Sequence, residues 1–266
     1  MKRKLMGVFC LFITAVLVLS ACGSSEESVT LAGSTSVQPL AEELAHAFME
    51  KNDARVEVSG GGSGAGVRAA QTGTADIGMA SRALKDDETG IRPITIAIDG
   101  IAVVANPDNE VSDLTVEQVR DIFSGKITNW KEAGGADAEI VVVNREEGSG
   151  TRDAFSEIVL GDESFAADAI IQNSTGAVRE AVSQDASAIG YISLGGLNDS
   201  VKPLRINGAE PTEENIKQDK YPIARPLNFL VSDSEEINKT AQAFIDFILS
   251  DEGQAIAADL GFVTVN

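Results

Sequence analysis

Short apolar runs alternate with stretches of helical spacing along most of the chain. Apolar runs of strand length lie at residues 29–32, 55–58, 77–80, 94–98, 101–105, 141–143, 188–193, 201–206 and 228–231. Apolar residues recur at helical spacing within residues 37–51, 67–72, 115–123, 151–160, 174–184, 235–249 and 251–260. Because the two periods distinguish strands from helices, this repeated order of strand and helix predicts α/β layers.

The strand–helix order is interrupted and then resumed, which predicts two lobes. Asn106-Pro107-Asp108-Asn109 suits a first crossing between the lobes, and residues 221–226, with two prolines, suit a return crossing. We therefore expect lobe I to comprise residues 29–105 and 226–266, and lobe II to comprise residues 106–225. Ligand loops in open α/β sheets follow the carboxyl ends of strands, so the loops of both lobes should face a shared cleft.

The N-terminus has the pattern of an export signal. Three cations at residues 2–4 precede an apolar run at residues 8–19, and Leu19-Ser20-Ala21-Cys22 resembles a bacterial lipobox. An ordinary signal peptide or a short membrane helix would share the first two features, but the run is short for a span. We expect a signal peptide over residues 1–21, lipidation (palmitate) at Cys22, a tether over residues 22–28, and a location on the extracellular face of the cell membrane.

Charge and cysteine content exclude several kinds of partner. The formal net charge is −20, which argues against nucleic acid. Cys10 lies in the expected leader, so the mature chain keeps only Cys22, and neither a disulfide framework nor a cysteine-based metal site can form. We expect no metal, no cofactor and a monomer. The acidic charge does not forbid an anionic ligand, because charges beyond about 8 Å are largely screened at physiological salt.

Four loops share one device, in which a strand ends, small hydroxyl residues follow, and a helix can begin. The fullest example is residues 144–152, which read Asn-Arg-Glu-Glu-Gly-Ser-Gly-Thr-Arg. Its glycines allow close backbone approach, the first helix amides lack intrahelical partners, and its hydroxyls and arginine donate hydrogen bonds. The other loops lie at residues 33–36, 62–64 and 80–82.

Donors that converge from several loops suit a small, desolvated oxyanion. Burying a doubly charged ion costs free energy unless many hydrogen bonds replace its water. A hydroxyl-rich turn before a helix is also a common N-cap, so no single loop carries the prediction. The glycine run at residues 60–66 lacks the lysine of the phosphate-loop pattern, which argues against a nucleotide.

Six motifs together resemble the periplasmic-type phosphate-binding proteins of phosphate ABC importers, in the lipoprotein branch of Gram-positive bacteria. They are Ala32-Gly33-Ser34-Thr35-Ser36, Gly60-Gly61-Gly62-Ser63-Gly64, Ile77-Gly78-Met79-Ala80-Ser81-Arg82, Asp99-Gly100-Ile101-Ala102-Val103-Val104, Phe123-Ser124-Gly125-Lys126-Ile127-Thr128-Asn129-Trp130 and Arg145-Glu146-Glu147-Gly148-Ser149-Gly150-Thr151. The resemblance covers essentially the whole mature chain. It implies an α/β, two-lobed periplasmic-binding-protein-like fold of type II, phosphate binding without enzymatic activity, and delivery of phosphate to the transmembrane subunits of an ABC permease.

The resemblance also implies a set of ligand-binding residues. Those that match the family's motifs are Ser34, Thr35, Ser36, Ser63, Ser81, Arg145, Ser149, Gly150 and Thr151. Glu147 matches an acidic position that orients the arginine. The third motif usually has an aspartate after Ala-Ser, and Arg82 stands there in this chain. Arg82 would either contact the anion or pair with an acid.

The departure at Arg82 bears on how phosphate would be distinguished from sulfate. Hydrogen phosphate keeps a proton that a buried carboxylate can accept, whereas sulfate would meet an unpaired charge. Our hypothesis for the acceptor is Asp99, which lies between two apolar runs, with Glu147 in reserve. Asp99-Gly100 is otherwise a common turn pair.

Three other functions fit part of the pattern. A binding protein for sulfate, molybdate or tungstate would use the same donors. A serine hydrolase would use Ser149 as nucleophile, but Gly-Ser-Gly lacks the full nucleophile-elbow pattern Gly-x-Ser-x-Gly. His46, the only histidine of the sequence, lies in another segment, which argues against a serine–histidine triad. A surface adhesin or sensor would carry the anion site as a secondary feature. We expect a binding protein and no enzyme.

Overall fold

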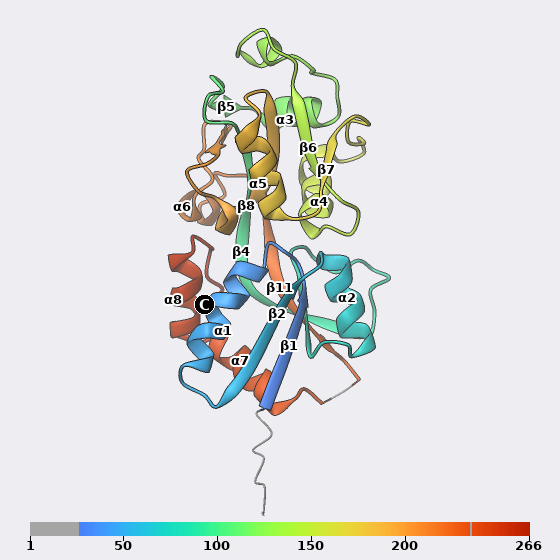
Figure 1. Cartoon of the computed structure of the whole chain (residues 1–266), viewed down its shortest axis with the longest axis vertical. Helices are drawn as coiled ribbons and strands as arrows, with labels where there is room; N and C mark the ends of the chain where they lie inside the picture. The colour runs from blue at the N-terminus through green and yellow to red at the C-terminus, as the bar shows by residue number, and fades with distance from the viewer. Residues whose placement is uncertain (1–26, 235) are drawn as a thin grey trace, which may run out of the picture.

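The chain folds into two lobes that are stacked along its long axis (Figure 1). The computed structural model describes residues 27–234 and 236–266. The expected signal peptide, the lipidation site at Cys22 and most of the tether lie outside these residues. Among the residues described, no helix has both the length and the apolar character that a membrane span requires. Below, lobe I denotes the half that contains β1, and lobe II the half that contains β6.

Two long strands run from one lobe into the other, and each lobe adds its own strands and helices. The crossing strands are β4 (Ile91–Ala105) and β11 (Ala224–Ser232). Lobe I holds β1 (Glu27–Gly33), α1 (Gln38–Met49), β2 (Ala54–Gly60), α2 (Ser63–Thr72), β3 (Ile77–Ala80), α7 (Lys239–Ile248) and α8 (Asp251–Asp259). Lobe II holds β5 (Asp113–Leu114), α3 (Val116–Phe123), η1 (Trp130–Ala133), β6 (Val141–Arg145), α4 (Gly150–Phe155), η2 (Ser156–Leu160), β7 (Ile170–Gln172), α5 (Thr175–Gln184), β8 (Ala188–Ser193), η3 (Leu194–Gly196), β9 (Lys202–Pro203), β10 (Arg205–Ile206) and α6 (Glu213–Lys217).

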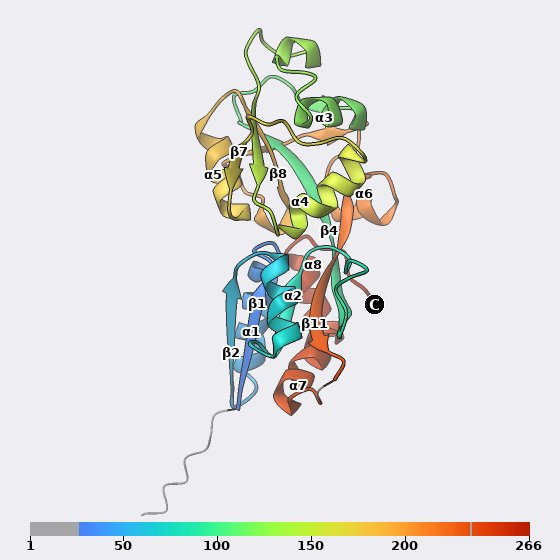
Figure 2. The same cartoon turned by 90° about the vertical axis from the view of Figure 1, so that its right-hand side faces the viewer.

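Strand pairing is continuous through both lobes. The order is β2-β1-β3-β11-β4-β8-β6-β7, with β9 also paired to β4, and β5 and β10 form a separate small sheet. β1 runs parallel to β2 and β3, and β6 runs parallel to β7 and β8. β4 and β11 are antiparallel to each other and to their other neighbours. The parallel strands of each lobe therefore bring their carboxyl ends to the boundary between the lobes, where loops can meet (Figure 2).

Each lobe has its own apolar core. In lobe I, Leu40, Leu44 and Phe48 of α1 pack with Phe244 of α7 and with Phe229 of β11. In lobe II, the buried cluster is centred on aromatic rings, and Phe155 and Tyr191 stack with their ring centroids 4.1 Å apart. Because dense packing resists deformation, each core holds its loops in a fixed place at the boundary.

The structure corrects several element boundaries expected from the sequence. The two apolar runs at residues 94–98 and 101–105 form one strand, β4, so Asp99-Gly100 is not a turn. Gly100 lies in a crowded position, because a Cβ there would come within 2.6 Å of Ile216 Cδ1. The expected helix at residues 151–160 divides into the α-helix α4 and a short π-helix, η2. The expected strand at residues 201–206 divides into β9 and β10.

Candidate anion-binding site

Two helices from different lobes begin next to each other at the boundary. α2 starts at Ser63 in lobe I, and α4 starts at Gly150 in lobe II (Figure 2). The backbone N–H of Gly64 donates to the carbonyl oxygen of Gly148 across the boundary at 3.0 Å. A Cβ on Gly150 would lie 2.2 Å from Ser63 Oγ. Only glycine therefore allows the lobes to approach this closely.

A first group of hydroxyls gathers beside Gly150. Ser34, Ser63 and Ser81 follow the carboxyl ends of β1, β2 and β3, and all three are buried. Ser34 Oγ donates to Ser81 Oγ at 2.9 Å, and Ser63 Oγ lies 3.3 Å from Ser81 Oγ. The Ser81 amide donates to Ser63 Oγ at 3.0 Å. Three loops that are far apart in the sequence thus form one polar group.

A second group of hydroxyls joins the lobes directly. Ser36 Oγ of lobe I lies 2.9 Å from Thr151 Oγ1 and 3.0 Å from Thr175 Oγ1, both in lobe II. All three residues are buried. Thr175 is not among the residues expected from the sequence. Ser174-Thr175 lies between β7 and α5 and repeats the pattern of strand end, hydroxyls and helix start, which is the signal that identifies it.

Arg145 is a buried cation at the edge of these groups. Its Nε donates to Glu146 Oε2 at 2.8 Å, and its Nη2 donates to Glu146 Oε1 at 3.0 Å and to Thr35 Oγ1 at 3.3 Å. The expectation that Glu147 orients the arginine is therefore wrong, because Glu146 does so. The chain turns at Glu147 and Gly148, and this turn leaves Glu147 exposed to solvent.

Asp99 lies in the same region, but its partners are protein donors. Arg225 donates to Asp99 Oδ2 from Nε at 3.2 Å and from Nη2 at 2.9 Å, and the Leu194 amide donates to Oδ1 at 3.0 Å. Complete burial raises the pKa of the Asp99 carboxyl, and the guanidinium opposes that shift. Arg225 also donates from Nη1 to Ser81 Oγ at 3.2 Å. Arg225 is not among the site residues expected from the sequence.

The guanidinium of Arg82 contacts acidic side chains and lies outside both groups of hydroxyl residues described above. Its Nη1 and Nη2 donate to the two carboxylate oxygens of Glu88 at 2.7 and 2.6 Å. Its Nε lies 3.0 Å from Asp153 Oδ2 in lobe II, and Lys85 Nζ lies 2.9 Å from the same oxygen. Burial acts to raise the pKa of Glu88, but donation by Arg82 and by the Lys85 amide holds it below its ordinary value. Of the two roles expected for Arg82, the structure has the one in which it pairs with an acid.

The remaining predicted residue, Ser149, caps a helix. Ser149 Oγ accepts a hydrogen bond from the Arg152 amide at 3.3 Å, which is the role of an N-cap. His46 is exposed on α1 and lies 3.9 Å from Glu50. Ser149 therefore has no histidine partner in the structure, and the arrangement donates hydrogen bonds without assembling a serine–histidine pair.

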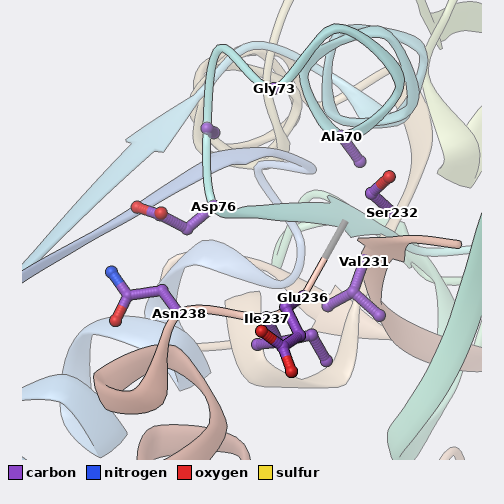
Figure 3. A pocket seen from close by; sticks show the side chains of 9 residues that line it. Ala70, Gly73, Asp76, Val231, Ser232, Glu236, Ile237 and Asn238 are labelled. Atoms are coloured by element: carbon purple, nitrogen blue, oxygen red, sulfur yellow. The ribbon is translucent and has the colours of Figure 1, made fainter. Parts of the chain in front are cut away.

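A separate hollow in lobe I has the wrong chemistry for an anion. It measures about 160 Å³ and lies between the end of α2 and the end of β11, with Asp76 and Glu236 in its lining (Figure 3). Asp76 Oδ2 accepts hydrogen bonds from the amide and the hydroxyl of Thr30. Two carboxylates would repel an anion, so this hollow is not a candidate anion site.

Comparison with known proteins places the chain in a family. Residues 20–252 match the PBP superfamily domain. The phosphate-binding protein PstS of Bacillus subtilis is 32% identical, over 100% of this chain and 95% of that protein. A Clostridium perfringens protein assigned as a phosphate ABC transporter substrate-binding protein, solved with bound phosphate, is 43% identical, with a TM-score of 0.87 over 90% of this chain and 100% of that chain. An ABC-type phosphate transport receptor of Vibrio cholerae is 35% identical, with a TM-score of 0.73 over 89% of this chain and 99% of that chain. These relationships confirm the resemblance and the fold class expected from the sequence, and the chain belongs to the PstS family of phosphate-binding proteins.

Proposed function

We propose that this protein binds inorganic phosphate between its two lobes and delivers it to an ABC importer. The observation that carries the proposal is the convergence of buried hydroxyls from both lobes at Gly150, beside Arg145. A solved relative with 43% identity has phosphate bound. Capture of an ion by hydrogen bonds requires no bond chemistry, so the protein acts as a binding protein and not as an enzyme.

We propose that the anion is held mainly by neutral donors. The ligand-binding residues in this proposal are Ser34, Thr35, Ser36, Ser63, Ser81, Arg145, Ser149, Gly150, Thr151 and Thr175. Arg82 is left out because its guanidinium faces Glu88 and Asp153. The lobe boundaries expected from the sequence, residues 29–105 and 226–266 for lobe I and 106–225 for lobe II, would move into β4, because Ile101–Ala105 pair with β8 of lobe II. The lobes would close about β4 and β11.

Delivery requires the protein to stay near a permease. We propose that the lipid at Cys22 anchors a monomer on the outer face of the cell membrane and that the closed, phosphate-bound form docks on the permease's transmembrane subunits. Lipoproteins with more than one acyl chain are held stably, whereas a single chain binds weakly and reversibly. Cell fractionation of the wild type and of a Cys22→Ala variant tests the anchor, and the variant is expected to leave the membrane fraction.

Competition calorimetry with phosphate, sulfate, molybdate and tungstate tests the ligand. We expect phosphate to bind most tightly, because one carboxylate, that of Glu146, lies at the site beside Arg145. A fully deprotonated anion offers this acid no hydrogen, so Glu146 disfavours it. Tighter binding of sulfate, molybdate or tungstate than of phosphate would contradict the proposal and favour a carrier for that oxyanion.

The ion pair between the lobes should add to phosphate affinity without contacting phosphate. Asp153→Asn removes the partner of Arg82 and Lys85 across the boundary. An exposed ion pair contributes roughly 0–1 kcal/mol, and Asp153 is only 21% exposed, so we expect about a threefold to tenfold weaker affinity for phosphate at low salt. Isothermal calorimetry measures the change.

Asp162→Asn is the matched control for this pair. Asp162 is an exposed residue of the same lobe, and its replacement changes the net charge of the protein equally. The control should keep the phosphate affinity of the wild type. If both variants lose affinity equally, the effect comes from total charge and the ion pair between the lobes has no role in closure.

A further inference from the structure

We propose that Arg225 is a positioning residue of the phosphate site, which is held by Asp99 and which fixes the Ser81 hydroxyl as a hydrogen-bond donor toward the anion. This proposal rests on the phosphate function proposed above. It gives Asp99 a role that differs from the one expected from the sequence, because Asp99 acts here through Arg225 and not by accepting the proton of phosphate.

Asp99 and Arg225 lie on the two strands that connect the lobes. They are direct partners in the antiparallel register of β4 and β11. Asp99 is 0% exposed and Arg225 is 3% exposed. Because the charges are buried, leaving either one without its partner would cost far more than breaking an exposed pair. The pair therefore fixes its own geometry on β4 and β11, the two strands that run between the lobes (Figure 1).

The guanidinium of Arg225 donates hydrogen bonds both to the Asp99 carboxylate and to Ser81. Nε and Nη2 donate to Asp99 Oδ2, at 3.2 and 2.9 Å. Nη1 donates to the carbonyl oxygen of Ser81 at 3.1 Å and to Ser81 Oγ at 3.2 Å. The planar fork of arginine can serve two directions at once, which a lysine ammonium on its flexible stem does less well. Asp99 is fixed in turn, because Oδ1 accepts from the Leu194 amide of lobe II.

These bonds determine what the Ser81 hydroxyl can do. A hydroxyl has one hydrogen and two lone pairs. Ser34 Oγ donates to Ser81 Oγ at 2.9 Å, and Arg225 Nη1 donates to it at 3.2 Å, so both lone pairs are used. The hydrogen of Ser81 is left to donate, on the side where Ser63 lies and where a Cβ on Gly150 would come within 2.8 Å of Ser81 Oγ. An anion bound there would receive a hydrogen bond from Ser81.

The pair adds this donor without adding net charge to the site. Asp99 balances the charge of Arg225, so the effect on phosphate passes through Ser81 and not through long-range attraction. The two anions phosphate and sulfate should therefore gain equally from it. If Asp99 instead accepted the proton of phosphate, its removal would weaken phosphate binding alone.

The test replaces both members of the pair with apolar residues. Such replacement of a buried ion pair is often neutral or stabilising for the fold, so Arg225→Met with Asp99→Leu separates stability from binding. We expect thermal unfolding without ligand to remain cooperative, phosphate affinity to fall by about tenfold, and sulfate affinity to fall by the same factor. Unchanged phosphate affinity would overturn the proposal. A loss confined to phosphate would overturn it as well and would make Asp99 the proton acceptor.

Ser81→Ala shows whether Arg225 acts on phosphate affinity through Ser81 or only supports the fold. In the Ser81→Ala background, the double replacement should cause little further loss of affinity, because Arg225 acts through Ser81. Fully additive losses would overturn the proposal. If the double replacement does not fold, Arg225→Lys in the same two backgrounds decides between these outcomes, since it keeps the charge and loses the fork. A wild-type protein that does not bind phosphate would instead refute the proposed function.

Discussion

Replacing Arg145 by glutamine should lower the affinity for phosphate by about 30-fold to several thousandfold, because truncating one partner of a buried, hydrogen-bonded charge pair costs about 2–5 kcal/mol or more. Arg145 is 2% exposed and donates to Glu146 and to Thr35. Its loss would remove a cation beside the anion and leave the Glu146 carboxylate unpaired there. Isothermal calorimetry measures the affinity, and thermal unfolding without ligand checks the fold.

Two further variants show whether Arg145 acts on phosphate itself. Arg205→Gln changes the charge of the same lobe equally, but Arg205 is 45% exposed and pairs with Asp113, so this control should keep the wild-type affinity. The double variant Arg145→Gln with Glu146→Gln removes the unpaired acid as well and should recover only part of the loss. Full recovery would mean that Arg145 only neutralises Glu146 and does not bind phosphate.

The order of strands and helices could be predicted from the sequence because each element carries its own periodicity. β4 was divided wrongly because Asp99-Gly100 has the local chemistry of a turn. What keeps the strand continuous is distant in sequence, namely Arg225 opposite Asp99 and the close packing of Ile216 on Gly100. A local pattern cannot report a partner that lies 126 residues away.

The same distinction applies to the site. Ser34, Ser63 and Ser149 could be proposed because each follows a strand and precedes a helix, which is a local signal. Arg225 lies within β11, in a segment whose prolines predict only a crossing between the lobes, and nothing near it in sequence indicates its acid partner. Which of two adjacent glutamates orients Arg145 is decided by the turn after β6, and spacing alone could not determine it.

Every buried arginine at the boundary between the lobes is paired with an acid. Arg145 pairs with Glu146, Arg225 with Asp99, and Arg82 with Glu88 and Asp153. The site therefore offers many directed donors and little net positive charge. Binding then depends on how closely the two lobes bring their donors together. At Gly150 the lobes approach so closely that there is no room for a side chain.

Gly150→Ala should lower phosphate affinity by about 5-fold to 150-fold, because forcing an extra methyl group into a packed site costs about 1–3 kcal/mol. In the closed arrangement the new Cβ would lie 2.2 Å from Ser63 Oγ and 2.8 Å from Ser81 Oγ, so the lobes would be held apart or the serines displaced. Alanine favours helix more than glycine by about 0.5–1 kcal/mol, so thermal stability without ligand should be unchanged or slightly higher. The loss should appear in calorimetry and as a smaller stabilisation of the protein by added phosphate.

Gly176→Ala is the matched control for this variant. Gly176 lies in the first turn of α5, also in lobe II, and a Cβ there would meet no atom within 4 Å. Both variants add one methyl group at the start of a helix, so the helix propensity changes in the same direction and only the contact with lobe I differs. Gly176→Ala should keep the wild-type affinity. Equal affinity in Gly150→Ala and wild type would mean that phosphate is bound without the close approach of Gly150 to Ser63, and the site would have to be sought in a more open arrangement of the lobes.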